Sequence, residues 1–357
     1  MQDGLLGGMR VLDFGQWRPA PYATQLLADL GAEVLKVEPP NADPMRVFPE
    51  IFATVASHKR SVVLDLKDPA GRARVLELAA DADVVVEGWR PGVAERLGVG
   101  PDDVRAVNRS VVYCSLSGFG AVGPLSHVTG HDVNYQARAA SLSPDGGAPS
   151  PSPSPRVPWA DLAGGLGAAF AICAAWIGRV RTGEGETIDV SMTDLLATWT
   201  GTVGGGVLES VGKPVQGLPG YGTFEVADGY VALGVITEQH FWTAMCRVLG
   251  LDDIAELDVP GQIERSEELR ARITAALVHE KRDDIVERLV AAGAPAAPVL
   301  SRAELVADEH FRARHTLYDT PLGPAFGHPI RFVDHPARGP SAPPDPGEHQ
   351  YTGFSAR

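Results

Sequence analysis

Two side chains suited to proton transfer, His131 and Asp161, stand 30 positions apart in unlike surroundings. His131 lies in the segment Gly-His-Asp-Val-Asn-Tyr at residues 130–135, and a histidine can take or give a proton near neutral pH. Asp161 opens a long apolar run, residues 162–180, where a carboxylate is costly to bury unless it is hydrogen-bonded or functional. Brought together across a substrate, the pair could move a proton from one face of a carbon to the other.

Both residues also have purely structural interpretations, which the sequence leaves open. Asp161 could be the N-cap of the helix that the apolar run forms, and His131 could be a satisfied structural histidine. No second histidine stands at a metal-ligand spacing, so we expect no metal site. The N–H groups at the helix start favour an ionised Asp161 and are candidate donors to a developing oxyanion. Glu238 is most simply a first-turn helix acid, and joins the site only if a domain closure brings it to His131.

A set of cations suggests an anionic ligand. Taken one by one they fit solvated surface charges, but as a set near Gly-rich turns they favour a phosphorylated ligand. We expect them beside the carboxyl ends of strands, where ligands bind in open α/β sheets. They are Lys59, Arg60, Lys67, Arg90 and Arg96.

The composition is that of a globular, acidic protein. The 357 residues are enough for two domains, and 31 basic against 45 acidic residues leave a net charge of −14, which argues against a broad nucleic-acid-binding surface. Cys114, Cys173 and Cys246 share no metal-ligand spacing and fit a reducing cytoplasm as apolar fillers. No signal peptide is visible, and the Gly-containing run 162–180 fits a buried core helix better than a membrane span.

The first 115 residues alternate between strand and helix patterns. Short apolar strands separated by helices predict a parallel sheet covered on both faces, in a Rossmann-like α/β domain. The expected strands are residues 9–13, 33–38, 61–66, 83–87 and 110–115, and the expected helices are residues 19–30 and 68–80. The first turn, residues 15–21, lacks the G-x-G-x-x-G pattern, so the main sequence evidence for a nicotinamide or flavin cofactor is missing.

The rest of the chain predicts a connecting loop and a second, smaller α+β domain. Residues 145–158 are rich in Gly, Pro and Ser, and this stretch, a flexible lid or a surface spacer, separates His131 from Asp161. A hairpin turning at Asp228-Gly229 follows, and the Pro- and Gly-rich last 25 residues are expected to wrap on a surface as a tail. Further patterns are a strand near residues 183–190 and helices at 192–202, 238–249, 266–277 and 282–292. We place the large domain at 1–185 with 325–357, a linker at 186–218 and the small domain at 219–324.

With these motifs, the chain resembles the family III CoA-transferase superfamily (CaiB/BaiF type) and, within it, the α-methylacyl-CoA racemase branch. The similarity covers nearly the whole length, and the shared segments are together specific for the superfamily. They are residues 19–38, 59–61, 64–67, 90–93, 95–98, 117–120 and 181–186. The Gly-His-Asp-Val-Asn-Tyr segment is similar to the racemase motif.

The resemblance implies roles for individual residues. Asp161 matches an aspartate that is an acid/base group in racemases. In transferases the same aspartate is the nucleophile, which forms an acyl anhydride and then an enzyme–CoA thioester. His131 matches the second racemase base, and Glu238 resembles the glutamate that hydrogen-bonds it. The implied contacts to the CoA substrate are Leu64, Asp65, Lys67, Glu87, Trp89, Arg90, Arg96, Gly130, Asp132, Asn134 and Tyr135.

The chain departs from the family pattern at a few positions. Pro39 stands where racemases often have an arginine that contacts CoA, and Thr237 is one residue extra before Glu238. Trp17 and Arg18 in the first turn replace the usual small residues, and could reshape the acyl or CoA pocket.

The resulting expectation is a 2-methylacyl-CoA racemase. His131 and Asp161 would face each other across Cα, removing its proton to form an enolate and returning one from the opposite face, with roles reversing between enantiomers. The alternatives are a family III CoA transferase acting on carboxylic acids and a catalytically silent CoA-thioester binder. CoA enters as part of the acyl-CoA substrate, with no other cofactor. The resemblance also implies an interlocked homodimer, and we expect a cytoplasmic enzyme of lipid metabolism without nucleic-acid or membrane partners.

Overall fold

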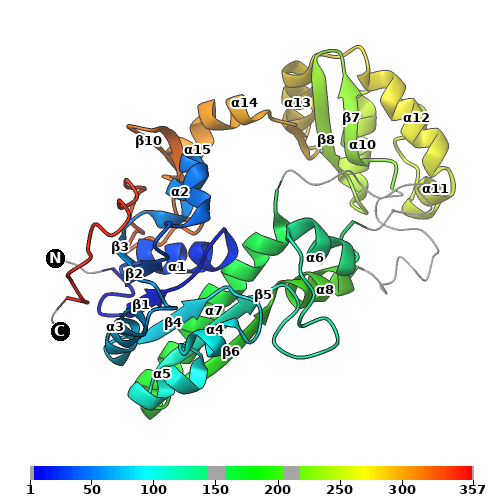
Figure 1. Ribbon diagram of the computed structural model, residues 1–357. Helices are drawn as coiled ribbons and strands as arrows, with labels where there is room; N and C mark the ends of the chain where they lie inside the picture. Colours follow the sequence, from blue (N-terminus) through cyan, green and yellow to red (C-terminus); the bar gives the residue numbers. More distant parts are fainter. Residues whose placement is uncertain (1–3, 143–156, 204–217, 356–357) are drawn as a thin grey trace. The chain divides into compact units, whose positions relative to one another are not determined.

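A computed structural model describes residues 4–142, 157–203 and 218–355, and the chain divides into two compact units (Figure 1). Of the described residues, unit 1 holds 4–142, 157–200 and 308–355, and unit 2 holds 201–203 and 218–307. Unit 1 carries the six-stranded sheet, and unit 2 carries a three-stranded sheet with its own helices.

The sheet of unit 1 has the strand order β3-β2-β1-β4-β5-β6, and every neighbouring pair is parallel. The expected Rossmann-like α/β architecture is therefore confirmed. The strand order reverses between β1 and β4, and such a switch point leaves a crevice at the carboxyl ends of the strands. The strands are β1 (Arg10–Asp13), β2 (Glu33–Glu38), β3 (Lys59–Val63), β4 (Val84–Glu87), β5 (Val112–Ser117) and β6 (Glu186–Ser191).

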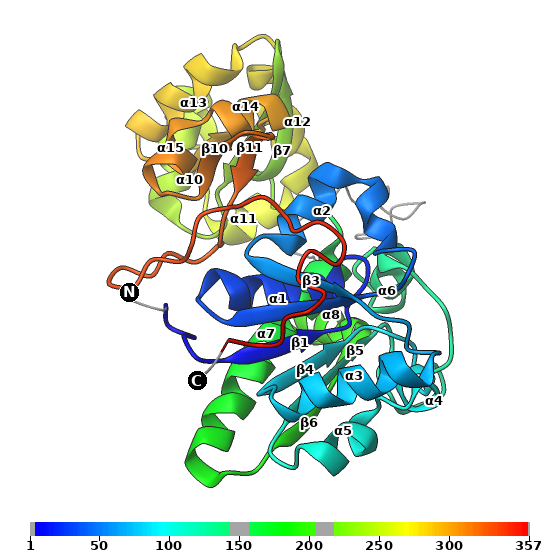
Figure 2. The same ribbon diagram turned by 60° about the vertical axis from the view of Figure 1, so that its left-hand side comes forward.

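Helices cover both faces of this sheet (Figure 2). One face packs against α1 (Pro19–Asp29) and α7 (Trp159–Thr182), and the other against α3 (Pro69–Ala80) and α5 (Pro101–Val107). Because successive strand side chains point to opposite faces, Val84 and Val86 join the first core and Val85 the second. The remaining elements of unit 1 are η1 (Pro44–Val47), α2 (Pro49–Ala56), α4 (Val93–Leu97), α6 (Asp132–Arg138), α8 (Met192–Val203), α15 (Glu309–Ala313), β10 (Leu317–Thr320) and β11 (Gly323–Phe326).

The long helix α7 lies directly against α1. A Cβ atom at Gly165 would come within 2.7 Å of the Tyr22 ring and 2.8 Å of the Pro19 carbonyl oxygen, so only glycine allows this approach. Among the described helices, α7 alone is long and apolar enough to cross a membrane, yet its residues Ala168 and Ile172 are fully buried in the core.

Unit 2 is a small α+β unit built on an antiparallel sheet in the order β7-β8-β9. Its apolar core contains Trp242 and Met245 from α10, Leu269 from α12 and Ile285 from α13. The elements are β7 (Tyr221–Val226), β8 (Gly229–Gly234), α10 (Gln239–Val248), η3 (Asp252–Ile254), α11 (Val259–Glu264), α12 (Ser266–Leu277), α13 (Arg282–Ala291), β9 (Ala296–Pro298) and α14 (Arg302–Ala307). The three helices expected in this region are confirmed as α10, α12 and α13.

Several element boundaries differ from the expectation. The third strand begins at Lys59 rather than at residue 61, because two charged residues at its start are paired and can enter the sheet. The hairpin turn consists of Ala227 and Asp228, since Val226 is already paired with Gly229. Residues 186–200, expected in the linker, form β6 and most of α8 within unit 1, where β6 completes the sheet beside β5.

The ends of the expected small domain and of the chain also belong to unit 1. Residues 308–324, expected in the small domain, lie in unit 1. The C-terminal tail runs along the edge strand β3, where Gln350 exchanges two hydrogen bonds with the Val63 backbone and thereby covers an open strand edge (Figure 2). Of the Gly/Pro/Ser-rich stretch 145–158, the part up to residue 156 lies outside the described residues.

The contact between α1 and α7 predicts unlike responses to alanine at two glycines of one helix. Gly165→Ala should cost about 1–3 kcal/mol because the new methyl group has no room. Gly178→Ala meets nothing within 4 Å and should be neutral or stabilising by up to about 1 kcal/mol, since alanine is the better helix former. Urea unfolding of both variants measures the difference, and equal stabilities would contradict the packing described here.

Candidate active site

A cavity of about 330 Å³ opens at the switch point of the sheet. Its walls come from the segments that follow β1, β4 and β5, from the loop before α6, and from the first turns of α1, α7 and α8. Both candidate proton-transfer residues, His131 and Asp161, line it. The other lining residues are Gln16, Trp17, Pro19, Ala20, Gly88, Trp89, Arg90, Pro91, Leu116, Ser117, Gly118, Phe119, Ser126, Val128, Thr129, Gly130, Tyr135 and Met192.

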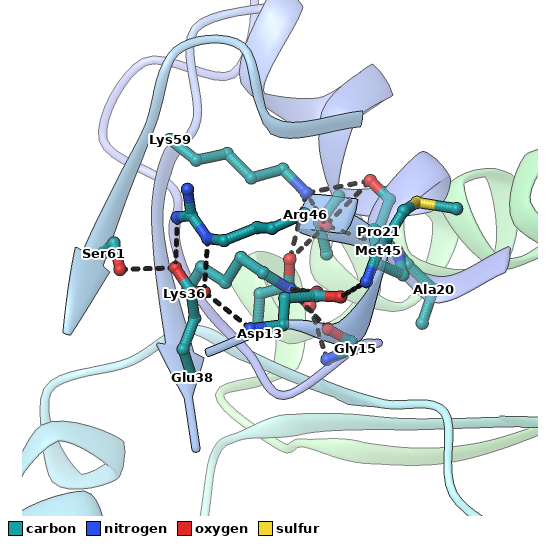
Figure 3. Close-up of polar contacts among 12 residues, drawn as sticks. Asp13, Gly15, Ala20, Pro21, Lys36, Glu38, Met45, Arg46, Lys59 and Ser61 are labelled. Carbon is teal, nitrogen blue, oxygen red and sulfur yellow. Dashed lines mark hydrogen bonds and ion pairs between the residues drawn. The ribbon is translucent and has the colours of Figure 1, made fainter. Parts of the chain in front are cut away.

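A buried polar network holds the loop between β1 and α1, which supplies one wall of the cavity (Figure 3). The Asp13 carboxylate pairs with the Lys59 ammonium at 3.0 Å and accepts hydrogen bonds from the Thr24 hydroxyl and the Gly15 N–H. The Lys36 ammonium donates to the Gly15 carbonyl oxygen at 2.5 Å and pairs with an Asp43 carboxylate oxygen at 2.7 Å. The loop therefore starts from a fixed backbone.

The charges of this network compensate one another. Burial by itself raises the pKa of Asp13, but Lys59 and Lys36 outweigh it and hold the pKa below its usual value. Lys59 also donates to the Pro21 carbonyl oxygen, while Arg60 pairs with Glu33 at 2.5 Å. The expectation of ligand-binding cations is therefore wrong for Lys59 and Arg60, which open β3 at the end opposite to the cavity edge and are already paired.

The loop itself turns sharply at Trp17. Its φ of 61° is the left-handed conformation, which is uncommon for a bulky side chain and typical of functional sites. The indole remains about half exposed on the cavity wall. On the neighbouring wall, Trp89 stacks on Phe14 with ring centroids 5.5 Å apart, so two tryptophans give this end of the cavity an aromatic lining.

One carboxylate, that of Asp132, joins the segment carrying His131 to the segment carrying Asp161. Asp132 is the first residue of α6, and His131 stands immediately before it. The Asp132 Oδ1 accepts hydrogen bonds from the N–H of Ala160 at 2.8 Å and of Asp161 at 3.1 Å. Pro158, the N-cap residue of α7, makes no side-chain cap, so Asp132 satisfies these two donors instead.

Further hydrogen bonds fix the backbone around His131. The Asn134 Oδ1 accepts from the His131 N–H at 3.0 Å, and the Tyr135 hydroxyl donates to the Gly130 carbonyl oxygen at 2.6 Å. The Tyr135 ring packs so close to Gly118 that a Cβ there would lie 2.2 Å from it. The His131 imidazole itself is exposed at the cavity.

Asp161 has an electrostatic environment suited to taking and giving a proton. Its pKa is raised to about 7, mainly by burial and further by the nearby Asp132 carboxylate, while Arg18 acts in the opposite direction. The interpretation of Asp161 as an N-cap is wrong, because α7 begins at Trp159 and Asp161 is its third residue. The N–H groups at the helix start were expected to favour ionised Asp161. Burial and the negative charge of Asp132 outweigh that effect and raise the pKa.

The first turn of α7 offers no spare N–H for an oxyanion. The N–H groups of Ala160 and Asp161 donate to Asp132, that of Trp159 to the Val157 carbonyl oxygen, and that of Leu162 to the Pro158 carbonyl oxygen. The expectation that these groups stabilise a developing oxyanion is therefore wrong.

Only four of the residues expected to contact CoA line the cavity. Trp89, Arg90, Gly130 and Tyr135 line the cavity. Glu87 is buried behind it at the end of β4, where its Oε2 accepts from the Trp89 N–H at 2.7 Å and burial raises its pKa to about 7. Asp132 and Asn134 hold the backbone by the bonds described above.

The remaining residues expected at the site, four CoA contacts and Glu238, also do not line the cavity. Leu64, Asp65 and Lys67 follow β3 at the same edge of the sheet, with β2 and β1 between them and the switch point. Arg96 is exposed on α4. Glu238 belongs to unit 2, where it is the N-cap residue of α10 and its exposed carboxylate accepts from the Thr237 N–H at 3.0 Å.

Two features of the site carried little or no sequence signal. The capping of α7 by Asp132 joins residues from two helices, and the half-buried Arg18 beside Asp161 depends on the packing of α1 against α7. For Arg18 the only signal was that it and Trp17 are larger than the residues usual in this turn.

The chain is similar to known proteins in both sequence and fold. The model of CoA-transferase family III matches residues 6–350. The chain is 30% identical to an acetyl-CoA:oxalate CoA-transferase of Acetobacter aceti, over 95% of this chain and 92% of that one. It is also 30% identical to the human alpha-methylacyl-CoA racemase, over 96% and 91% of the two chains. A CAIB/BAIF family protein from Brucella suis superimposes with a TM-score of 0.85 at 30% identity, over 98% of both chains.

The like charge of Asp132 predicts a measurable shift at Asp161. Asp132→Asn keeps an oxygen that can accept from Ala160 and Asp161 but removes the negative charge, so the pKa of Asp161 should fall below about 7. Carbon-13 NMR titration of the Asp161 carboxyl group measures this shift. Asp132→Ala should in addition cost about 1 kcal/mol of stability, because two helix N–H groups lose their acceptor. An unchanged pKa in Asp132→Asn would contradict the electrostatic coupling.

Proposed function

The chain belongs to CoA-transferase family III, and on this premise we propose that it inverts the α-carbon of a 2-methylacyl-CoA by two-base proton transfer. The observation that carries the proposal is that His131 and Asp161, from two different helix starts, line one cavity. A cavity of about 330 Å³ suits an acyl group and the adjoining thioester better than a whole CoA molecule.

The chemistry divides between the two bases. One base removes the proton from Cα, the electron pair moves into the thioester carbonyl to form an enolate, and the other base returns a proton to the opposite face. A pKa of about 7 lets Asp161 exist in both protonation states near neutral pH, as a group that is base for one enantiomer and acid for the other must do. We assign Glu238 to orienting the His131 imidazole, on the basis of the family resemblance.

A second candidate function is transfer of CoA between carboxylic acids, favoured by relatives such as the acetyl-CoA:oxalate CoA-transferase. In that reaction an ionised Asp161 carboxylate attacks the thioester carbonyl and CoA leaves as a thiolate, which gives an acyl anhydride. CoA thiolate then attacks the anhydride at the Asp161 carbonyl and releases the free acid, which gives an enzyme–CoA thioester. The raised pKa of Asp161 disfavours this role near neutral pH, because the nucleophile must be ionised.

Exchange in D2O tests the two-base proposal. The wild-type protein should exchange the α-hydrogen of both enantiomers of 2-methylbutanoyl-CoA and interconvert them. His131→Ala and Asp161→Asn should each lose racemisation by about 10²–10⁴-fold and keep exchange for opposite enantiomers only, because one base remains in each. For the enantiomer that Asp161 deprotonates, the wild-type kcat/KM should rise with pH through about 7, and for the other it should fall.

The same assay separates the alternatives. If Glu238 orients the His131 imidazole, Glu238→Gln should slow only the direction of racemisation in which His131 is the base. Absence of exchange together with CoA transfer to a free carboxylate, and hydroxylamine trapping at Asp161, would assign the protein to the transferases instead.

The proposed enzyme is a homodimer, and the exposed side of α7 supports this. Leu166, Phe170, Ile177 and Val180 follow one another at intervals of four, seven and three residues, so they form one stripe along the helix. All four are exposed in the single chain, Phe170 by 76%. A contiguous apolar stripe of this kind is typical of a protein–protein interface.

Phe170→Glu should therefore shift the protein from dimer to monomer in sedimentation equilibrium, because a charge placed in an apolar interface is not compensated. Val47→Glu, at a side chain of similar exposure (72%) outside α7, serves as the control and should leave the mass unchanged. A wild-type protein that sediments as a monomer would rule out the dimer.

A further inference from the structure

A second cavity, of about 350 Å³, lies in the C-terminal part of unit 1. Its walls come from the end of α15, from β10 and from the segment 328–337 (Figure 1). It shares no lining residue with the switch-point cavity, and we call it the C-terminal cavity. A volume of this size is sufficient for a small organic ligand.

One side of the C-terminal cavity is cationic. Arg314 and Arg331 line it, and both are exposed. Within residues 4–142, 157–203 and 218–355, neither guanidinium takes part in a hydrogen bond or ion pair. The nearby Asp319 carboxylate is already paired with Arg312 at 2.8 Å, and none of the described residues that line the cavity carries a carboxylate. A protein with a net charge of −14 thus keeps two uncompensated positive charges at one cavity.

The cavity wall also carries a histidine in a place where glycine is usual. The His315 N–H donates to the Arg312 carbonyl oxygen at 2.9 Å, and the Thr316 N–H donates to that of Phe311 at 3.0 Å. These two bonds form a Schellman motif at the end of α15, in which the residue at position 315 must be left-handed. Its φ is 55°, a conformation that favours glycine and strains a side chain. The chain therefore places an imidazole at the cavity at a cost in backbone strain.

A second imidazole, that of His328, is fixed by the backbone at the cavity wall. Its Nδ1 lies 3.1 Å from the Ile330 nitrogen and 3.0 Å from the Ile330 oxygen, so Nε2 is the ring nitrogen left for a ligand. The ring packs against Phe332, with the two centroids 5.7 Å apart. Burial lowers the pKa of His328, which suits a hydrogen-bonding partner rather than a third charge.

The other side of the cavity is apolar and open to solvent. Ile330 and Val333 line it with exposed fractions of 51% and 73%. The Tyr318 ring, also in the wall, is packed against Gly327 and Gly339, where a Cβ atom would come within 2.7 and 3.0 Å of it. A fixed ring and exposed apolar side chains beside two cations suit a ligand with an anionic head and an apolar body.

A purely structural role explains these residues less well. Arginines that stabilise unit 1 are paired, as Arg46 is with Glu38 and Arg179 with Asp83. Solvated surface charges would not require a histidine in the left-handed position of a Schellman motif, where glycine is more favourable. A free inorganic anion would use the cations and leave the apolar wall uncovered.

We propose that the C-terminal cavity binds a phosphate monoester whose ester group is a flat apolar ring, of which a nucleoside monophosphate is the simplest example. Arg314 and Arg331 pair with the phosphate oxygens, which their planar N–H forks match. His315 and His328 provide further hydrogen bonds to the phosphate, and the ring packs against Phe332. The site is separate from the proposed racemisation, because the two cavities share no residue.

Calorimetric titration with adenosine monophosphate (AMP), adenosine and inorganic phosphate tests this inference. The wild-type protein should bind AMP about 10- to 100-fold more tightly than either fragment, because only AMP uses both the cations and the apolar wall. Arg314→Met and Arg331→Met should each weaken AMP about 10-fold and leave adenosine unaffected.

Two arginines outside the C-terminal cavity provide matched controls. Arg90 lines the switch-point cavity, and Arg109 lines neither cavity; both are exposed and, among the described residues, their guanidinium groups have no partner. Arg90→Met and Arg109→Met should leave the affinity for AMP unchanged. Weakening by Arg90→Met together with no effect of Arg314→Met would place AMP in the switch-point cavity and overturn the proposal.

Replacing His315 separates a binding role from a role in folding. His315→Gly should raise the midpoint of urea unfolding, because glycine adopts the left-handed conformation without strain, and should weaken AMP about 10-fold. A histidine that serves only the fold would instead lose stability on this change and leave AMP binding as it was. That result, or equal affinity of the wild-type protein for AMP and adenosine, would overturn the proposal.

Discussion

The compensation of one buried carboxylate, that of Asp13, underlies the arrangement of the cavity. Asp13 ends β1 at the centre of the sheet, where a lone charge would be too costly to bury. Lys59 from β3 pairs with it, and Thr24 from α1 donates to it, so strands and helix converge on a single group (Figure 3). The loop that leaves β1 is thereby fixed at Gly15, and its strained turn at Trp17 faces the cavity.

A second carboxylate, that of Asp132, couples geometry to electrostatics at the site. By accepting from the first N–H groups of α7, it sets the distance between the two helix starts that carry His131 and Asp161. The same negative charge raises the pKa of Asp161. Because the Asp132 side chain has both effects, a change at Asp132 alters the placement of His131 and Asp161 together with the pKa of Asp161.

This coupling bears on the choice between the two reactions known among the relatives. A carboxyl group that is half protonated near neutral pH is suited to exchange a proton, whereas a nucleophile must be ionised. Arg18 acts against burial and Asp132 by favouring the ionised form.

The sequence by itself determined the alternation of strands and helices, the parallel sheet and the family, because these follow from local apolar patterns and from motifs of contiguous residues. It also singled out His131 and Asp161. It could not show that Lys59 is buried, because a charged residue is expected at the surface unless its partner is known. That partner, Asp13, lies 46 positions away. Nor could it show that Asp132 caps α7 from 28 and 29 positions away, or that Arg18 lies beside Asp161. Those relations depend on contacts between elements distant in the chain, and only the tertiary structure decides them.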